Sequence, residues 1–168
     1  VEKLIGFARK YPDIVIDVIG YDYYDVDIKN NPPKNIIFHG YKSGDQLLQI
    51  LSNADCAIST MSYHSIGLLE ASPLKTRQYL GLGIPTIIPY HDTDLFDLDS
   101  EFLLKIPNEE KNVEEYGQAI HDFVFAMRGR RIPRELIFER IDISVKEAQR
   151  LEFFQRVIEE SKAEKENR

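Results

Sequence analysis

The sequence predicts an α/β fold, a Rossmann-like parallel sheet with helices on both faces. Short apolar runs rich in β-branched residues, such as 14–19 and 84–89, are typical of strands that are covered on both sides. These runs alternate with longer segments of helical periodicity, which is the pattern of βαβ units. A chain of 168 residues is long enough for one such domain with a sizeable core.

Composition and charge narrow the class of protein. Hydrophobic residues make up 43% of the chain and charged residues 29%, as in ordinary globular domains. The net charge of −7 argues against a surface that binds nucleic acid or an anionic membrane. The single cysteine, Cys56, lies in an apolar run, which favours an inert core thiol in a reducing compartment. No apolar run reaches membrane-spanning length.

The first part of the chain alternates helix and strand. The expected elements are a helix over 1–11, a strand over 14–19, a strand over 35–39, a helix over 44–52 and a strand over 54–59. The polar, proline-rich residues 21–34 indicate a surface loop. Gly20 directly follows the first strand, where a glycine either lets the backbone approach a ligand or simply makes a tight turn.

The second part continues the alternation. The expected elements are a loop over 61–69, a helix over 73–82, a strand over 84–89, an acidic solvated loop over 90–100, a strand over 102–106, a helix over 113–127 capped by Asn112, and a final helix from Ser144. Val145, Ala148, Leu151 and Phe154 form a stripe of the final helix that is expected to face a partner surface. The polar tail 161–168 is expected to fray.

Residues 70–89 are the most informative segment. Ser72 is a good N-cap residue, Pro73 suits the first helical position, and Gly83 ends the helix. Ser72, Lys75 and Gln78 recur every three residues and are expected to share one helix face. A helix N-terminus with a lysine and an amide beside it suits a phosphate that carries a ribose. The alternative is that these residues are ordinary start and stop signals of a helix that binds no ligand.

This segment also resembles a known family. Glu70, Ser72-Pro73-Leu74-Lys75-Thr76, Gln78-Tyr79-Leu80 and Gly83-Ile84-Pro85 look like the donor-site segment of retaining GT-B glycosyltransferases of the "group 1" family (glycosyltransferase family 4-like). The family pattern is E-x-S-P-L-K-x-x-E-Y-L-x-x-G-x-P, so Gln78 departs from it where a second glutamate is expected. More loosely, 36–41 resembles "I-x-F-x-G-Y" and 54–59 resembles "A-D-x-x-x-x-P-S".

The resemblance implies the C-terminal, donor-binding half of a GT-B fold. Residues 1–168 would form one nucleotide-sugar-binding domain, with 144–168 as C-terminal helix and polar tail. The N-terminal acceptor domain is absent, and so is the strand that opens such a half, with the Arg and Lys that hold the donor diphosphate. The implied activity is a retaining, metal-independent, hexosyltransferase-like transfer of a sugar from a nucleotide diphosphate to a glycan or lipid-linked acceptor, in polysaccharide biosynthesis. The implied place is the cytoplasm, or the inner face of the membrane through the missing domain.

Site residues follow from the same resemblance. Glu70 and Lys75 are the catalytic candidates: Glu70 would accept hydrogen bonds from the transferred sugar, and Lys75 would stabilise the leaving diphosphate. The donor-binding candidates are Gly20, Tyr41, Ser59, Ser72, Leu74 and Gln78. Backbone groups at Tyr41 would contact the base, while its ring is preferred as a half-buried turn aromatic. Gln78 takes the ribose position and lacks the charge-assisted hydrogen bond of a glutamate.

Alternatives and partners complete the expectations. A non-catalytic nucleotide-binding or regulatory α/β module is the rival from another class, and a GT-B-type sugar-nucleotide epimerase is the enzymatic rival. No metal and no cofactor beyond the donor sugar nucleotide is expected, although Asp25-Val26-Asp27 and Asp92-Thr93-Asp94 have the D-x-D spacing. His64 stands alone in its loop, without metal-ligand spacing. The expected partners are the donor, the N-terminal domain and the acceptor, with no nucleic acid; self-association of the isolated domain is also considered.

Overall fold

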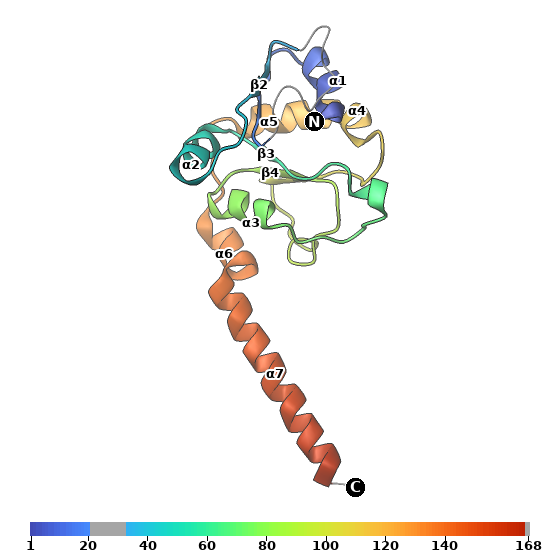
Figure 1. Ribbon diagram of the computed structural model, residues 1–168, viewed down its shortest axis with the longest axis vertical. Coiled ribbons are helices and arrows are strands. Elements are labelled where there is room, and N and C mark those ends of the chain that lie inside the picture. Colours follow the sequence, from blue (N-terminus) through green and yellow to red (C-terminus); the bar gives the residue numbers. More distant parts are fainter. Residues whose placement is uncertain (21–32, 167–168) are drawn as a thin grey trace.

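The computed structural model describes residues 1–20 and 33–166, with side chains as far as residue 163. The helices are α1 (Glu2–Lys10), α2 (Gly44–Asn53), the 3₁₀ helix η2 (Tyr63–Ile66), α3 (Leu74–Gly81), α4 (Asn112–Glu115), α5 (Gly117–Met127), α6 (Arg134–Ile141) and α7 (Ile143–Glu166). The strands are β1 (Ile16–Val18), β2 (Ile36–Phe38), β3 (Ala57–Ile58), β4 (Thr86–Ile88) and β5 (Leu103–Lys105). Helices and strands alternate through most of the chain, so the predicted α/β class is confirmed (Figure 1).

The strands form two parallel sheets. β1 pairs with β2, and β4 lies between β3 and β5 in a second sheet. The parallel direction of the strands was predicted. The single continuous sheet was not obtained, because no described residue pairs with the edge of β1 that faces away from β2 or with the edge of β3 that faces away from β4. Each described strand is also shorter than its apolar run, although flanking residues such as Ser59 and Ile106 still donate hydrogen bonds to the neighbouring strand.

Helices cover both sides of the second sheet. Figure 1 shows α1, α4 and α5 on one side of β3 and β4, and α3 and α6 on the other. On the first side, Phe7 and Ala8 of α1 pack in one cluster with Ile16, Ile87 and Ile120. A second cluster includes Leu80, Ile88, Met127 and Ile137. Burying each large apolar side chain of these clusters stabilises the fold by roughly 1.5–3 kcal/mol, and this burial holds the layers together.

Two polar side chains fix the position of α1. The Lys3 ammonium donates to Met61 O, Glu109 O and Asn112 Oδ1, each at 2.9 Å. The Asn35 amide donates to three carbonyl oxygens at the end of α1 and in the turn after it, those of Ala8, Tyr11 and Ile14. Because buried carbonyl groups need partners, these contacts define both ends of the helix. Asn112 therefore accepts from Lys3 and does not cap a long helix, and the predicted helix 113–127 is divided at Tyr116 into α4 and α5.

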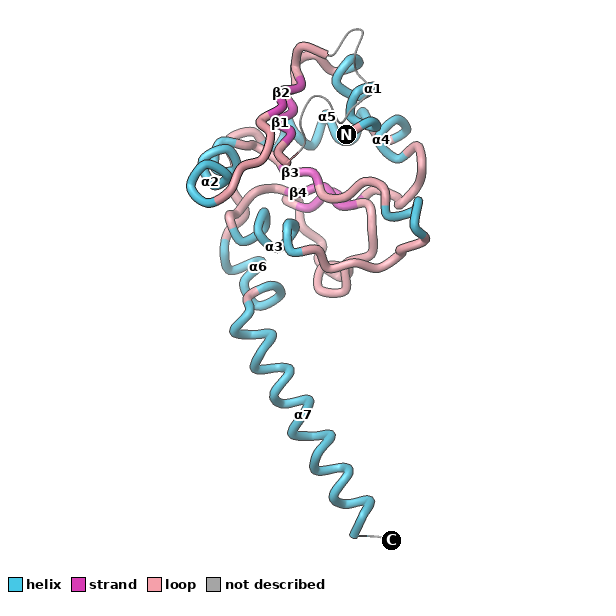
Figure 2. The backbone as a smooth tube through the Cα atoms, viewed as in Figure 1, coloured by secondary structure: helices cyan, strands magenta, loops and turns pink. Residues whose placement is uncertain are grey.

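The C-terminal helix is longer than predicted and extends away from the other elements. α7 runs without interruption from Ile143 to Glu166, so the tail that was expected to fray is helical as far as Glu166 (Figure 2). Of the stripe predicted to face a partner, Leu151 and Phe154 are 61% and 53% exposed and Ala148 is also exposed, whereas Val145 is half-buried. The described residues therefore leave most of this stripe uncovered. α6, which leads into α7, was not predicted. Within the described residues, no helix has the length and apolar character needed to cross a bilayer.

Candidate functional site

The helix α3 begins one residue later than predicted. Its N-cap is Pro73, whose carbonyl accepts the N–H groups of Thr76 and Arg77, and no side chain caps the helix. Ser72 is thus outside the helix, because its hydroxyl accepts a hydrogen bond from the Arg77 guanidinium instead. The shared face that was predicted for three residues holds for Lys75 and Gln78 only. The predicted stop is confirmed, since Gly83 follows the helix with φ of 72°.

Lys75 lies in the first turn of α3 without a partner. Its side chain is solvent-exposed, and within the described part of the chain no carboxylate or carbonyl bonds its ammonium. Desolvation by nearby protein atoms nevertheless lowers its pKa. Burial also lowers the pKa of the Val1 amino group, and the charge of Lys75 adds to that effect. Lys75 is therefore within electrostatic range of the amino group at the start of α1.

Gly20 and Gly40 lie side by side at the carboxyl ends of β1 and β2. The N–H of Gly20 donates to Gly40 O at 2.9 Å, and both glycines have positive φ, 91° and 64°. Among the described residues, no heavy atom would lie within 4 Å of a Cβ atom at either glycine, so these residues leave space beside both turns. Tyr41 follows directly and is 82% exposed. The expected half-buried ring is therefore corrected to an exposed one, because no described element packs over this turn.

Ser59 is buried within a triangle of hydroxyl groups. Its Oγ lies 2.7 Å from Thr76 Oγ1 and 2.8 Å from the Tyr90 hydroxyl, which is itself 2.7 Å from Thr76 Oγ1. Only 4% of Ser59 is exposed, so its side chain cannot touch a ligand from this position. It connects the end of β3 to α3 and to the residue after Pro89. Burial raises the pKa of Tyr90, which keeps the phenol protonated as a hydrogen-bond donor.

The other candidate side chains are exposed. The Glu70 carboxylate is 67% exposed, and its Oε1 lies 3.6 Å from His91 Nδ1. A parallel bridge between Glu70 and His91, with Ala71 N–H donating to His91 O, holds this segment beside the chain that leaves β4. Leu74 is 86% exposed, and Gln78 is exposed with no hydrogen bond to the described residues. Glu70, Lys75 and Gln78 are thus all open to solvent on one segment.

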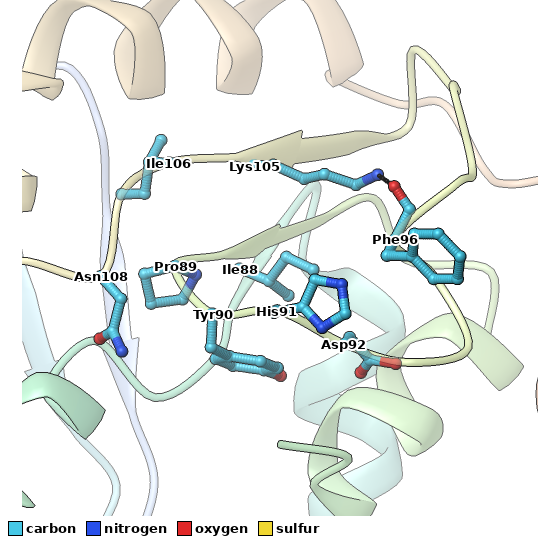
Figure 3. A pocket seen from close by; sticks show the side chains of 9 residues that line it. All are labelled: Ile88, Pro89, Tyr90, His91, Asp92, Phe96, Lys105, Ile106 and Asn108. Atoms are coloured by element: carbon cyan, nitrogen blue, oxygen red, sulfur yellow. Dashed lines mark hydrogen bonds between the residues drawn. The ribbon is translucent and has the colours of Figure 1, made fainter. Parts of the chain in front are cut away.

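A pocket of about 300 Å³ adjoins His91 at the carboxyl ends of β4 and β5. Its walls are Ile88, Pro89, Tyr90, His91, Asp92, Phe96, Lys105, Ile106 and Asn108 (Figure 3). Lys105 Nζ donates to Phe96 O at 2.8 Å, and the ring centroids of His91 and Phe96 lie 5.4 Å apart. Small-molecule sites begin at about this size. Glu70, through its contact with His91, lies next to this pocket.

The sequence-based reasoning missed Arg77, which organises the segment. Arg77 donates two hydrogen bonds to the fully buried carboxylate of Asp92, each of 2.7 Å, and one of 2.8 Å to Asp94. Lys146 of α7 bonds the other oxygen of Asp94 at 2.6 Å. The loop 90–100 is therefore not a solvated rim, because two of its carboxylates hold α3 and α7. The signal in the sequence was an arginine in the helix with an acidic pair after the next strand.

Metal and cysteine chemistry have little support within this site. Among residues 1–20 and 33–166, no three His, Cys, Asp or Glu side chains gather where a metal ion could be held. The pair Asp92 and Asp94 bonds Arg77 and Lys146, and Asp25-Val26-Asp27 lies outside the described residues. The Nδ1 atom of His64 is buried and has no partner in the described structure. Burial raises the pKa of the Cys56 thiol to about 12, so the thiolate needed for reactivity is scarce.

The fold and the site together define an α/β protein with parallel strands and an exposed, cationic helix N-terminus. Comparisons with protein-family models, with curated proteins and with solved structures found no match.

Proposed function

We propose that this chain is the donor-binding domain of a glycosyltransferase, with a Rossmann-like sheet of the C-terminal GT-B type. It would transfer a sugar from a nucleotide diphosphate to a glycan or lipid-linked acceptor, in a retaining, metal-independent reaction. The observation that carries the proposal is Lys75, an ammonium in the exposed first turn of α3 that no described residue pairs with. Free helix N–H groups and a cation together favour a diphosphate.

The chemistry of the transfer fits this setting. When the bond between the sugar and the diphosphate breaks, negative charge develops on the leaving phosphate oxygens. Donors that are already in place stabilise that charge without reorganisation. The amides of Leu74 and Lys75 and the Lys75 ammonium would supply them.

The remaining groups suit the other parts of a sugar nucleotide. Gln78 lies one turn along α3 from Lys75 and offers an amide oxygen to a ribose hydroxyl. The open space beside Gly20 and Gly40, next to the exposed Tyr41, would take the base against the backbone. Glu70, at the edge of the pocket of about 300 Å³, would accept hydrogen bonds from hydroxyls of the transferred sugar. Ser72 and Ser59 would support the site indirectly, through Arg77 and Thr76.

The isolated domain is expected to bind a donor weakly and to transfer no sugar. A GT-B reaction needs a second domain that closes the cleft and brings the acceptor, so that the reacting groups meet in a dry, oriented site. Without it, Lys75 and the helix dipole act in screened water and gain little. A cytoplasmic setting, an N-terminal partner domain and self-association through the exposed stripe of α7 belong to the same proposal.

A panel of nucleoside diphosphates and labelled donor sugars tests the proposal. Thermal unfolding of the chain should shift with at least one diphosphate and with none of the matching nucleosides, because Lys75 and the helix N-terminus recognise phosphate. Incubation with the labelled donors and a broad acceptor panel should release no diphosphate at ordinary enzyme rates of about 1–10³ per second. Turnover by this chain alone would contradict the half-enzyme proposal, and no shift with any diphosphate would contradict the donor site.

One observation favours the rival reading of a non-catalytic nucleotide-binding module. Gln78 is a neutral side chain at the position where the resemblance expects a carboxylate, so the ribose contact loses its charge-assisted hydrogen bond. Joining the chain to an N-terminal GT-B domain distinguishes the two readings. A transferase gains turnover in that context, whereas a binding module binds nucleotides and stays inactive.

A further inference from the structure

The order of the strands leaves a position between β1 and β3 that no described strand occupies. From β1 the chain moves outward to β2, and from β3 it moves outward in turn to β4 and β5. In doubly wound parallel sheets the chain proceeds outward in both directions from a central strand. The order here is β2-β1 and β3-β4-β5, which is the order of such a sheet without its central strand. This inference rests on strand order alone and is independent of the proposed function.

The hydrogen-bond pattern gives the free edges of this position. Ile16 and Val18 bond to β2, since Ile16 N–H donates to Asn35 O and Val18 O accepts from His39. Because alternate residues of a parallel strand bond to opposite sides, the N–H and C=O of Asp17 point away from β2. In β3, Ala57 and Ser59 donate to Pro85 O and Ile87 O of the β4 side. The N–H and C=O of Ile58 therefore point away from β4.

The two edges belong to one layer of the molecule. Ile16 and Val18 of β1 share a buried cluster with Ile87 of β4, and Ile58 of β3 packs against that cluster. Ile19, directly after β1, packs on a second cluster that contains Ala57 of β3. Figure 2 shows β1 and β3 as neighbours in this layer. Two nearby strand edges with unpaired backbone groups are a template for a further strand, which takes about 4.8 Å on each side.

The surroundings define what fits there. Buried residues of α1, α4 and α5 lie on one side of the layer, and those of α2 and α3 on the other. A central strand covered on both faces is a continuous apolar run, not an alternating one. Its carboxyl end would lie at the edge where β1 and β3 end, close to the N-terminus of α1, since Lys3 in the first turn of α1 donates to Met61 O in the chain that follows β3.

We propose that the edges of β1 and β3 bind one extended, apolar, β-branched strand, parallel to both and continuous with the N-terminus of α1. Such a strand bonds Asp17 on one side and Ile58 on the other, and joins the two sheets into one. The strand, α1 and β1 then form a βαβ unit of the usual kind.

The test compares chain 1–168 with a chain extended at Val1 by about five alternating valines and isoleucines and a Gly-Ser connection. The measurement is hydrogen exchange of the Asp17 and Ile58 amides, followed by NMR. The extension should slow exchange of both amides at least about tenfold and raise the thermal midpoint, because both amides gain acceptors. A control extension of equal length, with serine and a central proline, should do neither.

A substitution on the free edge sharpens the comparison. Asp17→Pro removes the N–H that faces the gap and leaves the bonds of Ile16 and Val18 to β2 intact. It should destabilise the extended chain clearly more than it destabilises chain 1–168, relative to Asp17→Ala, which removes only the contact with His39. Equal effects in the two chains would overturn the proposal.

Other outcomes are equally decisive. Slow exchange of both amides in monomeric chain 1–168, unchanged by the extension, would show that the chain closes its own gap and would overturn the proposal. Protection of chain 1–168 that grows with concentration, together with a dimer in light scattering, would assign the edge to a second copy and also overturn it. If the extended chain does not fold, the same strand is added to chain 1–168 as a peptide: saturable protection supports the proposal, and no effect at millimolar peptide rejects it.

Discussion

The guanidinium of Arg77 holds the buried carboxylate of Asp92 through two parallel hydrogen bonds of 2.7 Å. Arg77 belongs to α3, and Asp92 belongs to the loop after β4, so this pair fixes the helix against the sheet. Asp94 extends the network from Arg77 to Lys146 in α7. The exposed first turn of α3 thus stands on a rigid, charged support. Substitutions at this support are expected to act on stability first.

Arg77→Ala should lower the free energy of unfolding by about 3–5 kcal/mol, because it leaves the Asp92 carboxylate buried and unpaired. Chemical denaturation of both proteins measures the change. The matched control is Arg130→Ala, which breaks an exposed pair with Glu101 and should cost about 0–1 kcal/mol. The double substitution Arg77→Met with Asp92→Leu should recover much of the loss. Equal effects at Arg77 and Arg130 would show that the Asp92 carboxylate is not buried as described.

Lys75→Ala should weaken the binding of a nucleoside diphosphate. The loss expected for one charge-assisted contact to phosphate is on the order of 1.5–3 kcal/mol. Titration calorimetry with the best diphosphate of the panel measures it. Lys162→Ala in α7, also an exposed lysine, is the control and should leave affinity unchanged. Equal affinities of the wild-type and Lys75→Ala proteins would remove Lys75 from the site.

Gln78→Glu should tighten the binding of diphosphates with an intact ribose, because a carboxylate accepts a stronger hydrogen bond from a hydroxyl group than an amide does. The 2′,3′-dideoxy analogues lack these hydroxyls and should bind as before. Calorimetry with both kinds of ligand gives the comparison. A similar change for both would mean that residue 78 does not face the ribose.

His121 should make stability depend on pH near neutrality. Its hydrogen bond to Asp13, with a second contact to Asp122, raises the pKa of the imidazole above its ordinary value of 6.5. The stabilisation from the charged form is therefore complete below that value and is lost as pH rises through the folded-state pKa. His121→Asn should destabilise the protein more at about pH 5.5 than at about pH 9. The same difference at both pH values would rule out this pair as its source.

The sequence predicted the order of helices and strands better than it predicted how the strands pair into sheets. Periodicity placed most of the helices and the strands because burial of an apolar face is a local property of the chain. It did not predict that the sheet is divided, since pairing depends on which strand edges meet in space. It also predicted one helix over 113–127, whereas Lys3, distant in sequence, bonds Asn112 at the start of a separate short helix.

The candidate site was predicted in its segment and less well in its details. Residues 70–78 do form a turn and a helix start, with Glu70, Lys75 and Gln78 exposed, as the Pro73 and Gly83 signals indicated. The role of Ser72 was misjudged. A serine before a proline often caps a helix, whereas here the Ser72 hydroxyl accepts a hydrogen bond from the Arg77 guanidinium, which also bonds Asp92. Ser59 was expected to bind the donor, and Asp92 was expected to lie in a solvated loop. Both side chains are instead buried and hydrogen-bonded to residues of α3. Such tertiary partners leave no periodic trace in a sequence.

The most direct test of the account is an NMR titration of the isotope-labelled chain with a nucleoside diphosphate and, separately, with its nucleoside. The account predicts saturable shifts of the Leu74 and Lys75 amide signals with the diphosphate, absent with the nucleoside and much reduced in Lys75→Ala. Both amides lie in the first turn of α3. No saturable shift of these two signals with any diphosphate of the panel, or shifts of equal size with the nucleosides, would contradict a phosphate site at this helix.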